Sequence, residues 1–423
     1  MKKIILYTTI FILSISFLSV NAQFREYSSD TLSMDPFYAL DIFYSMSEGE
    51  ITSVAREGWD IAFYTSAFSA GIIINEGSGV QLFNYPIGDT SDWDNIDTTG
   101  LQAWIPIYNN PEYWEEGAFN KNATGHPDYG WGIYNMVTHS LTGDSLYIIN
   151  LPDVGYKKLW IVNKISTLNV YNIRYADLDG SNEQLVEIDI KPYTDKNFIY
   201  YSMSSDAVVD REPDSDWDLL FTKYIDFTED NSGNMVEYLV TGATSNINHY
   251  ANKFSPVGDD FVNWASQPFD SLKNVVGYNW KDYGGPSTGW IVEDSTAFFI
   301  MDKQGDVFKL VFTYWEGMMT GTFAFNKEQI HVSSIEDSKS VINTLAVYPN
   351  PASDMVNISV AGEHEFIGNI KITDFSGRIV HSSDIGKSDG SKVSVNTGNF
   401  VKGLYFITLY CDDFKATQKL ILK

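Results

Sequence analysis

The sequence predicts an all-β protein, and three observations support this class. Aromatic residues make up 15% of the chain, with 26 Tyr and 26 Phe, and such side chains favour strands. Short alternating or apolar runs, such as SLYIINL and VFKLVFTYW, are separated by Gly, Asp, Asn and Ser turns. Windows with apolar residues at helical spacing are scarce beyond the N-terminus.

The N-terminus has the pattern of a secretory signal peptide over residues 1–22. Met1-Lys2-Lys3 is a basic start, an apolar run follows, and Val20-Asn21-Ala22 offers small residues for cleavage before Gln23. No cysteine stands at the cleavage point, which argues against a lipoprotein. No later stretch reaches the roughly 18 apolar residues of a membrane helix, so no transmembrane segment is expected.

The net charge limits the possible binding partners, and the cysteine content limits the possible sources of stability. The formal net charge is −27, which repels nucleic acid and anionic membranes and argues against both as partners. Cys411 is the single cysteine, so stability must come from buried apolar area rather than from an internal disulfide.

The central region repeats several short phrases in the same order. The matching pairs are YSMS at 44–47 and 201–204, Trp-Asp at 59–60 and 217–218, Gly-Trp at 130–131 and 289–290, and a closing block from Asp144 and from Asp294. Four blocks in one order indicate a duplication. Each copy has about 150 residues, an ordinary domain size. The sequence thus predicts tandem modules at 23–190 and 191–332.

These blocks resemble the HmuY haemophore-like family. The pieces that carry the resemblance are Phe43 to Glu50, Trp59 to Phe63, Ile72 to Gly77, Gly130-Trp131 and residues 146–176. The second module matches less fully. The resemblance implies antiparallel β modules in a secreted or cell-surface protein. The best known members hold haem between two axial side chains, usually histidines.

The resemblance also directs attention to three haem-ligand candidates. At the first family histidine this chain has Glu115 to Phe119, with no histidine, while the second position falls on Met136, with His139 just after it. His126 precedes Gly130-Trp131. Imidazole and thioether groups both ligate haem iron. His126, Met136 and His139 are therefore the predicted cofactor-binding residues, although a histidine before Pro127 is also typical of a structural turn.

Catalysis is not predicted. Gly143-Asp144-Ser145-Leu146 spells the GDSL string of a hydrolase family, but no histidine follows an aspartate at the spacing that this family uses for its base. The string also leads into a strand, whereas a nucleophile turn leads into a helix. Asp177 to Gly180 is interpreted as a β-turn, and no metal site is assigned.

The C-terminal region carries a targeting signal. After a polar linker at 333–343, residues 344–423 resemble a type A sorting domain of the type IX secretion system, with alternating strands that predict a small Ig-like β-sandwich. The resemblance implies recognition by that machinery, followed by release or attachment to surface lipopolysaccharide, and thus a secreted or outer-membrane-surface location. The expected signal residues are Tyr348, Pro349, Asn350, Pro351, Asp374, Gly377, Gly403, Lys419 and Lys423.

Two non-catalytic functions follow from these patterns. The first is a binding protein for haem or another flat apolar ligand, which predicts a pocket lined by His126, Met136 or His139. The alternative is a structural or adhesive protein that binds polymer or protein through aromatic β faces, which predicts an exposed aromatic strip. A hydrolase with unidentified residues is a third class, and the scarcity of His and Cys argues against it.

Overall fold

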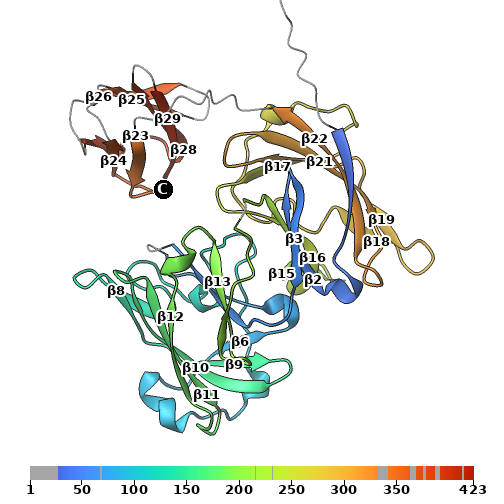
Figure 1. Cartoon of the computed structure of the whole chain (residues 1–423), viewed down its shortest axis with the longest axis vertical. Coiled ribbons are helices and arrows are strands. Elements are labelled where there is room, and N and C mark those ends of the chain that lie inside the picture. Colours follow the sequence, from blue (N-terminus) through green and yellow to red (C-terminus); the bar gives the residue numbers. More distant parts are fainter. Residues whose placement is uncertain are drawn as a thin grey trace, which may run out of the picture. The chain divides into compact units, whose positions relative to one another are not determined.

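The computed structural model divides into two compact parts, residues 1–333 and 334–423. It describes residues 27–66, 69–214, 216–230, 232–331, 342–362, 368–374, 378–385, 391–411 and 414–423. The predicted signal peptide and most of the predicted linker lie outside these residues. Each part is described by itself below (Figure 1).

The prediction of an all-β chain is confirmed. Every sheet in the described residues is antiparallel between neighbouring strands, and the helical elements are short 3-10 turns. These turns are η1 (Pro36–Tyr38), η2 (Glu76–Ser78), η3 (Thr90–Asn95), η4 (Leu101–Ala103), η5 (Ala118–Asn120), η6 (Lys191–Tyr193) and η7 (Trp264–Ser266). None of the helices in the described ranges has the length and apolar character needed to cross a membrane.

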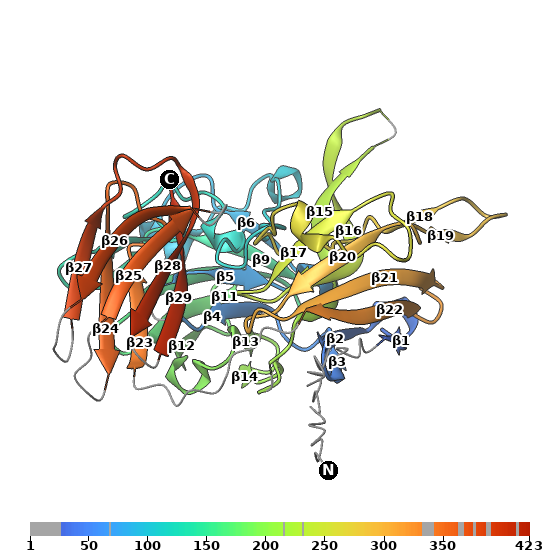
Figure 2. The same cartoon turned by 90° about the horizontal axis from the view of Figure 1, so that it is seen from above.

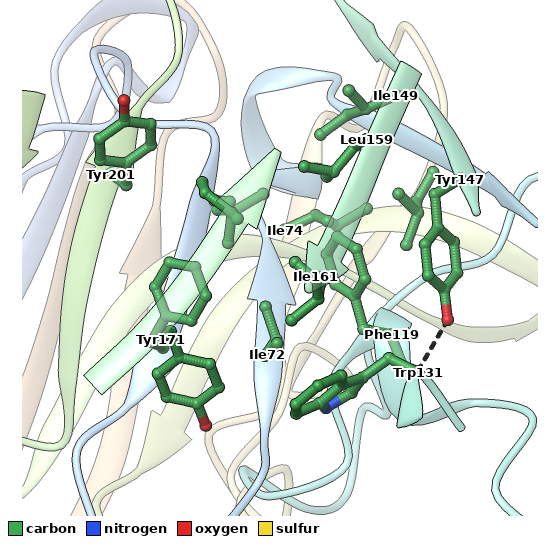
Figure 3. Close-up of a cluster of buried hydrophobic side chains, with 14 of the residues drawn as sticks. Ile72, Ile74, Phe119, Trp131, Tyr147, Ile149, Leu159, Ile161, Tyr171 and Tyr201 are labelled. Carbon is green, nitrogen blue, oxygen red and sulfur yellow. Dashed lines mark hydrogen bonds between the residues drawn. The ribbon is translucent and has the colours of Figure 1, made fainter. Parts of the chain in front are cut away.

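The first core lies between two sheets built from one continuous stretch of chain. One sheet has the order β12-β11-β10-β8-β7 with β6 and β9 attached, and the other has the order β14-β13-β4-β5. Isoleucine, leucine and aromatic side chains fill the space between them, including Trp131 and Tyr171 (Figure 3). The strands are β4 (Ile61–Tyr64), β5 (Ile72–Ile74), β6 (Gln81–Asn84), β7 (Gly132–Asn135), β8 (Ser140–Gly143), β9 (Tyr147–Leu151), β10 (Gly155–Ile165), β11 (Val170–Asp177), β12 (Gln184–Asp189), β13 (Phe198–Ser202) and β14 (Ala207–Val209).

The second core is built from two separate stretches of chain. Its sheets have the orders β1-β22-β21-β20-β17 and β16-β15-β2-β3, with the small pair β18-β19 beside them. Phe221, Phe312 and Phe325 lie at its centre. The strands are β1 (Tyr27–Ser33), β2 (Leu40–Ser45), β3 (Gly49–Ala55), β15 (Leu219–Glu229), β16 (Met235–Ser245), β17 (Tyr250–Phe254), β18 (Lys281–Tyr283), β19 (Trp290–Val292), β20 (Ala297–Met301), β21 (Val307–Trp315) and β22 (Thr322–His331).

The strands that carry the repeated YSMS phrase do not pair with the Trp-Asp strand of the same predicted sequence module. Strand β2 carries the first YSMS phrase and pairs with β15, so that Tyr44 lies opposite Leu219. Strand β13 carries the second phrase and pairs with β4, so that Tyr201 lies opposite Ile61. The N-terminal strands β1 to β3 therefore belong to the second core. The cores do not follow the sequence boundary at 190, and the linear module bounds, the duplication and the kinship to haemophore-like proteins stay predictions.

The repeated Trp-Asp phrase has a structural reason. In the first core, the Asp60 carboxylate accepts a hydrogen bond from the backbone N–H of Met203 at 2.7 Å. In the second core, the Asp218 carboxylate accepts one from Met46 at 2.5 Å. Both aspartates also donate their own N–H to the tyrosine two residues before that methionine. Each Asp thus fixes the turn that ends the YSM strand of the same core.

A buried ion cluster links the two stretches of the second core to the end of the first. Asp41 lies 2.6 Å from Arg56 and 2.8 Å from Arg211, and it accepts a hydrogen bond from Thr222. Burial alone would raise the pKa of the Asp41 carboxyl, but the two guanidinium groups outweigh it and hold that pKa below its usual value. Removing Asp41 would leave two buried cations without their counter-ion.

The C-terminal part consists of two antiparallel sheets around one core, as in a β-sandwich. The sheet orders are β23-β24-β27 and β26-β25-β28-β29, and Ile358, Ile372 and Ile407 lie between them. The strands are β23 (Ile342–Tyr348), β24 (Met355–Gly362), β25 (Gly368–Asp374), β26 (Ile379–Ile385), β27 (Ser391–Asn396), β28 (Gly403–Cys411) and β29 (Phe414–Leu422).

Candidate functional site

The predicted sorting residues converge on the last strand of the chain. The Asn350 side chain donates to the Lys419 carbonyl and accepts from the Ile421 N–H, both at 2.8 Å. Ala352 continues the contact, because it donates to Ile421 and accepts from Lys423. The motif of Tyr348 to Pro351 therefore holds the C-terminal end of β29 in place.

The remaining sorting residues support the same sheet. Asp374 lies opposite Tyr405 in the pairing of β25 with β28, and its carboxylate accepts from the backbone N–H and Nε of Arg378 at 3.0 and 2.9 Å. Gly403 begins β28 opposite Leu422. Gly377 lies outside the described residues. Apart from Gly377, the motifs thus fix the C-terminal strand and the turn after β25.

The three haem-ligand candidates lie around the β7–β8 hairpin of the first core. The rings of His126 and His139 both neighbour Tyr134, with centroid distances of 5.4 and 6.2 Å. The Tyr134 hydroxyl shares a hydrogen bond of 2.8 Å with Nδ1 of His139. Met136 lies in the connection between the strands and is 71% exposed. The structure thus brings the two histidines to one tyrosine, and it leaves Met136 in solvent.

This arrangement lacks the wall that a haem site needs. Haem is held between axial ligands by a surrounding surface of apolar side chains. His126, Met136 and His139 are all exposed. Among the described residues, no group of three His, Cys, Asp or Glu side chains is placed to hold a metal ion. The aromatic residue below the hairpin, Trp131, is buried and donates to the Ala70 carbonyl instead.

The second core has a matching hairpin, but its tryptophan differs from the one that the sequence pairing predicts. Trp280, directly before β18, is buried, and its carbonyl accepts from Glu293 just after β19. Trp131 holds the same place before β7, and its carbonyl accepts from Asp144 just after β8. The counterpart of Trp131 is therefore Trp280, and Trp290 is free to lie on the surface.

Trp290 belongs to an exposed surface that we call the aromatic–methionine patch. Its members come from η1, the β18–β19 pair and the connection between β21 and β22: Phe37, Tyr283, Trp290, Met318 and Met319. The Tyr283 and Trp290 rings are 5.4 Å apart. Phe37 donates its N–H to the Met318 carbonyl at 2.7 Å. A Cβ on Gly317 would lie 2.5 Å from the Trp290 indole nitrogen, so only glycine allows this close approach.

Backbone strain is concentrated beside the patch. Asp35, Phe37 and Tyr38 have φ values of 59°, 61° and 59°, in the left-handed region that side chains other than glycine rarely adopt. Such conformations cost about 1–2 kcal/mol per residue. The Phe37 side chain is nevertheless 65% exposed, so packing does not offset that cost. Strain that folding does not repay is typical of residues held for binding.

Buried aromatic rings form a firm base under the patch. Tyr38 stacks on Trp315 at 5.4 Å, and the Lys281 ammonium lies 4.2 and 4.4 Å from the rings of Trp280 and Trp315. Lys281 also donates to the Thr241 carbonyl at 2.5 Å. Burial lowers the pKa of Lys281 to about 7. The rings are thus fixed by stacking and by a cation that they enclose.

A polar hollow on the second core is a weaker candidate. It is lined by Ser28, Asp30, Met46, Ser47, Glu48, Gly49, Phe308, Lys327 and Gln329. Two of its charged groups are already paired, because Lys327 lies 3.4 Å from Asp30 and the Tyr44 hydroxyl donates to the same carboxylate. A ligand here would have to compete with these contacts.

The patch is the site that the sequence could not locate. More than half of the segment 27–331 separates Phe37 from Trp290 and Met318 along the chain. No rule of sequence spacing links residues that far apart. The one local signal is the paired Met318-Met319 in a glycine-bounded turn, since adjacent methionines in a turn are typical of adaptable surfaces rather than of cores.

Comparisons with known proteins identify the C-terminal part. Residues 346–423 match the family model of the secretion system C-terminal sorting domain. The search of curated proteins found no match. Among solved structures, the crystal structure of dimeric latent PorU from Porphyromonas gingivalis aligns with 83% of this chain and 31% of that one, at 10% identity and a TM-score of 0.18. This chain thus spans about a third of that protein, and so low a TM-score says nothing about the fold.

Proposed function

We propose that this protein is an exported, non-catalytic binding protein that uses the aromatic–methionine patch to hold a polymer or protein ligand. The sorting domain directs the chain to the type IX secretion machinery, and hence to the cell surface or the medium. The observation that carries the proposal is Phe37, which is held in a strained conformation and yet is exposed.

The chemistry of the patch suits an extended, largely uncharged surface. Exposed aromatic rings and methionines gain about 25 cal/mol for each Å² of apolar area that a ligand covers. Contiguous exposed apolar side chains are typical of binding surfaces, whereas single exposed apolar residues such as Leu185 are ordinary. The rigid rings below the patch lower the entropy cost of binding.

The patch is tested with two defined probes on the mature full chain. The polymer probe is a neutral β-1,4-glucan in affinity electrophoresis, and the protein probe is immobilised gelatin in surface plasmon resonance. A Phe37→Ala, Trp290→Ala double variant should lose at least tenfold in affinity for the probe that binds. Leu185→Ala is the matched control, because it removes a similarly exposed apolar side chain outside the patch.

Two outcomes would contradict this proposal. One is that the wild-type protein binds neither probe. The other is that the double variant and the Leu185→Ala control bind equally well, which would place the ligand elsewhere.

The haem ligands that the resemblance implies at the β7–β8 hairpin lack an apolar wall, and haem binding there is tested separately. One observation favours it: the rings of His126 and His139 both lie next to the ring of Tyr134. Titration with haem should give a sharp, saturating Soret band that disappears in a His126→Ala, Met136→Ala, His139→Ala triple variant. A broad band that survives the triple change would mean adsorption to exposed aromatic side chains.

A further inference from the structure

The β15–β16 hairpin extends far beyond the sheet that it belongs to. Each strand has 11 residues, and they pair along their whole length. The neighbouring strand β2 covers only residues 219–221 of β15. The rest forms an arm, and Figure 2 shows its far end projecting from the neighbouring strands of the second core. We use the name "arm" for residues 222–230 and 232–242.

The first core shows that the arm is not required for the fold. The corresponding hairpin there is β4 with β5, whose strands have only 4 and 3 residues. That short version encloses a complete core. The additional length in the second core therefore needs a reason other than packing.

The outer edge of the arm offers unpaired backbone groups. Strand β16 lies at the edge of its sheet. Near its base the edge is covered, because Ala243 pairs with Gly277 and the Thr241 carbonyl accepts from Lys281. From Met235 to Val240, no strand in the described part of the chain pairs with the outer edge. Such an edge is a template for an added strand.

The side chains of the arm are apolar where a solvated hairpin would be polar. Phe227, Met235 and Tyr238 are all exposed, the last two by 62%. Phe227 lies opposite Glu237 in the pairing, and Met235 lies opposite Glu229, so apolar and acidic side chains share one face. This mixture suits a partner strand that alternates apolar and basic residues.

Charge decides between a foreign partner and a second copy of this chain. The exposed charged groups of the arm are Glu229 and Glu237, while Asp230 and Lys223 are half-buried. Lys121 of the first core lies 3.8 Å from Glu237, and both side chains are partly exposed, so the pair is weak. Two arms paired antiparallel in the register that sets Glu237 opposite itself would bring two carboxylates together, which is destabilising.

The base of the arm is held firmly. The buried Glu76 carboxylate accepts hydrogen bonds from the N–H groups of Ile225 and Asn109, at 2.8 and 2.9 Å. The Asn274 amide donates a hydrogen bond to the Asp226 carboxylate, and the Tyr278 hydroxyl donates one to the Phe227 carbonyl. The arm is therefore presented in one orientation, which lowers the cost of adding a strand.

From these observations we infer that the arm is a docking site for an extended, basic segment of another protein, which adds a strand along the outer edge of β16. The added strand makes backbone hydrogen bonds with residues 235–240, and its Lys or Arg side chains pair with the glutamates. This inference is independent of the proposed patch.

The experiment uses the mature full chain and two synthetic peptides, one of alternating Lys and Val and one of alternating Glu and Val. Fluorescence anisotropy should show at least tenfold tighter binding of the basic peptide, with affinity falling as salt rises. Hydrogen exchange should show at least tenfold slower exchange at residues 235–240 when the basic peptide is bound.

Matched charge reversals separate the arm from the general acidity of the chain. Glu229→Lys with Glu237→Lys should lower affinity for the basic peptide at least tenfold. Glu187→Lys with Asp189→Lys changes the net charge equally on the exposed β12 strand and should leave affinity nearly unchanged. Equal losses in both variants, equal binding of the two peptides, or protection outside the arm would overturn the inference. A concentration-dependent dimer that protects residues 235–240 without peptide would also overturn it, because the occupant would then be a second copy.

Discussion

The two cores share a plan and differ at their ends. In both, a Trp-Asp strand pairs with a YSM strand in the same register, and the aspartate accepts the backbone N–H two residues beyond the tyrosine. The hairpins differ, because the first core has short β4 and β5 and the second has the long arm. Residues that fix the backbone are thus the ones that the two cores have in common, while exposed ends are free to acquire separate roles.

The same comparison reveals an electrostatic difference at the shared aspartate. Asp218 has a buried side-chain partner, since Nε2 of the His249 imidazole lies 2.8 Å from its carboxylate. For Asp60, burial raises the pKa of the carboxyl, although backbone N–H groups of Met203 and Ser204 favour its ionised form. Asp218 therefore has an imidazole partner in addition to its backbone donor, whereas Asp60 has backbone donors.

The largest expected effect tests which tryptophans correspond. Trp131→Ala and Trp280→Ala should each lower the free energy of unfolding by about 3–5 kcal/mol, because each removes a fully buried indole. Trp290→Ala should cost less than about 1 kcal/mol, because Trp290 is 38% exposed. Urea unfolding of the three variants measures these values. A large loss for Trp290→Ala with a small loss for Trp280→Ala would restore the Gly-Trp pairing read from the sequence.

The next effect separates the two aspartates. Asp218→Asn should destabilise the protein by about 2–3 kcal/mol, since it replaces the carboxylate that contacts the buried His249 imidazole by an amide. Asp60→Asn should cost under about 1 kcal/mol, because an amide oxygen still accepts from Met203. Because the folded pKa of Asp60 is raised, its contribution to stability falls as pH rises from the unfolded value through the folded one. Unfolding at several pH values should show a smaller slope in Asp60→Asn, and an unchanged slope would contradict this.

A smaller effect concerns Lys281, whose place in the first core is taken by Gly132 at the start of β7. Burial lowers the folded pKa of Lys281 from 10.5 to about 7. The unfolded chain then binds more protons between these pH values, so stability from this group rises with pH across that window. Lys281→Met should remove the rise and stabilise the protein at pH 6 by about 1 kcal/mol. An unchanged pH profile in Lys281→Met would mean that the amine is solvated in the folded protein.

The smallest change in stability is expected at the patch. Phe37→Gly should raise the free energy of unfolding by up to about 1 kcal/mol, because glycine adopts the positive φ without strain. Binding to the probe should fall in the same variant. If Phe37→Gly destabilises the protein clearly, the side chain is needed for packing, and its strain does not mark a binding site.

The sequence was sufficient for the fold class and for the sorting domain, and the physical reasons are local. Alternating runs and turn residues predict strands. The motif from Tyr348 to Pro351, together with the C-terminal tail, identifies the sorting domain. It was not sufficient for strand partners, because the two YSM strands present nearly the same residues to either Trp-Asp strand. Whether β2 pairs with β4 or with β15 depends on how the intervening chain closes, and this leaves no local signal.

The candidate site was missed for the same reason. Phe37 reaches Met318 and Trp290 only because β1 to β3 pack in the second core. The histidine cluster drew attention through rare residue types, whereas the patch consists of common ones. Gly289-Trp290 is the same dipeptide as Gly130-Trp131, but the buried position is occupied by Trp280, which has no glycine directly before it.

The strand exchange that builds the patch is tested most directly by a cysteine cross-link. In a Cys411→Ser background, Ser29→Cys is combined with Asn326→Cys, because these side chains already contact each other at 2.6 Å across β1 and β22. The comparison pairs Ser29→Cys with Arg174→Cys, the corresponding position on β11 of the first core. After mild oxidation, peptide mapping by mass spectrometry should find the disulfide between positions 29 and 326 and none between 29 and 174. A disulfide between 29 and 174 would show that the N-terminal strands belong to the first core, and that Phe37 lies away from Trp290.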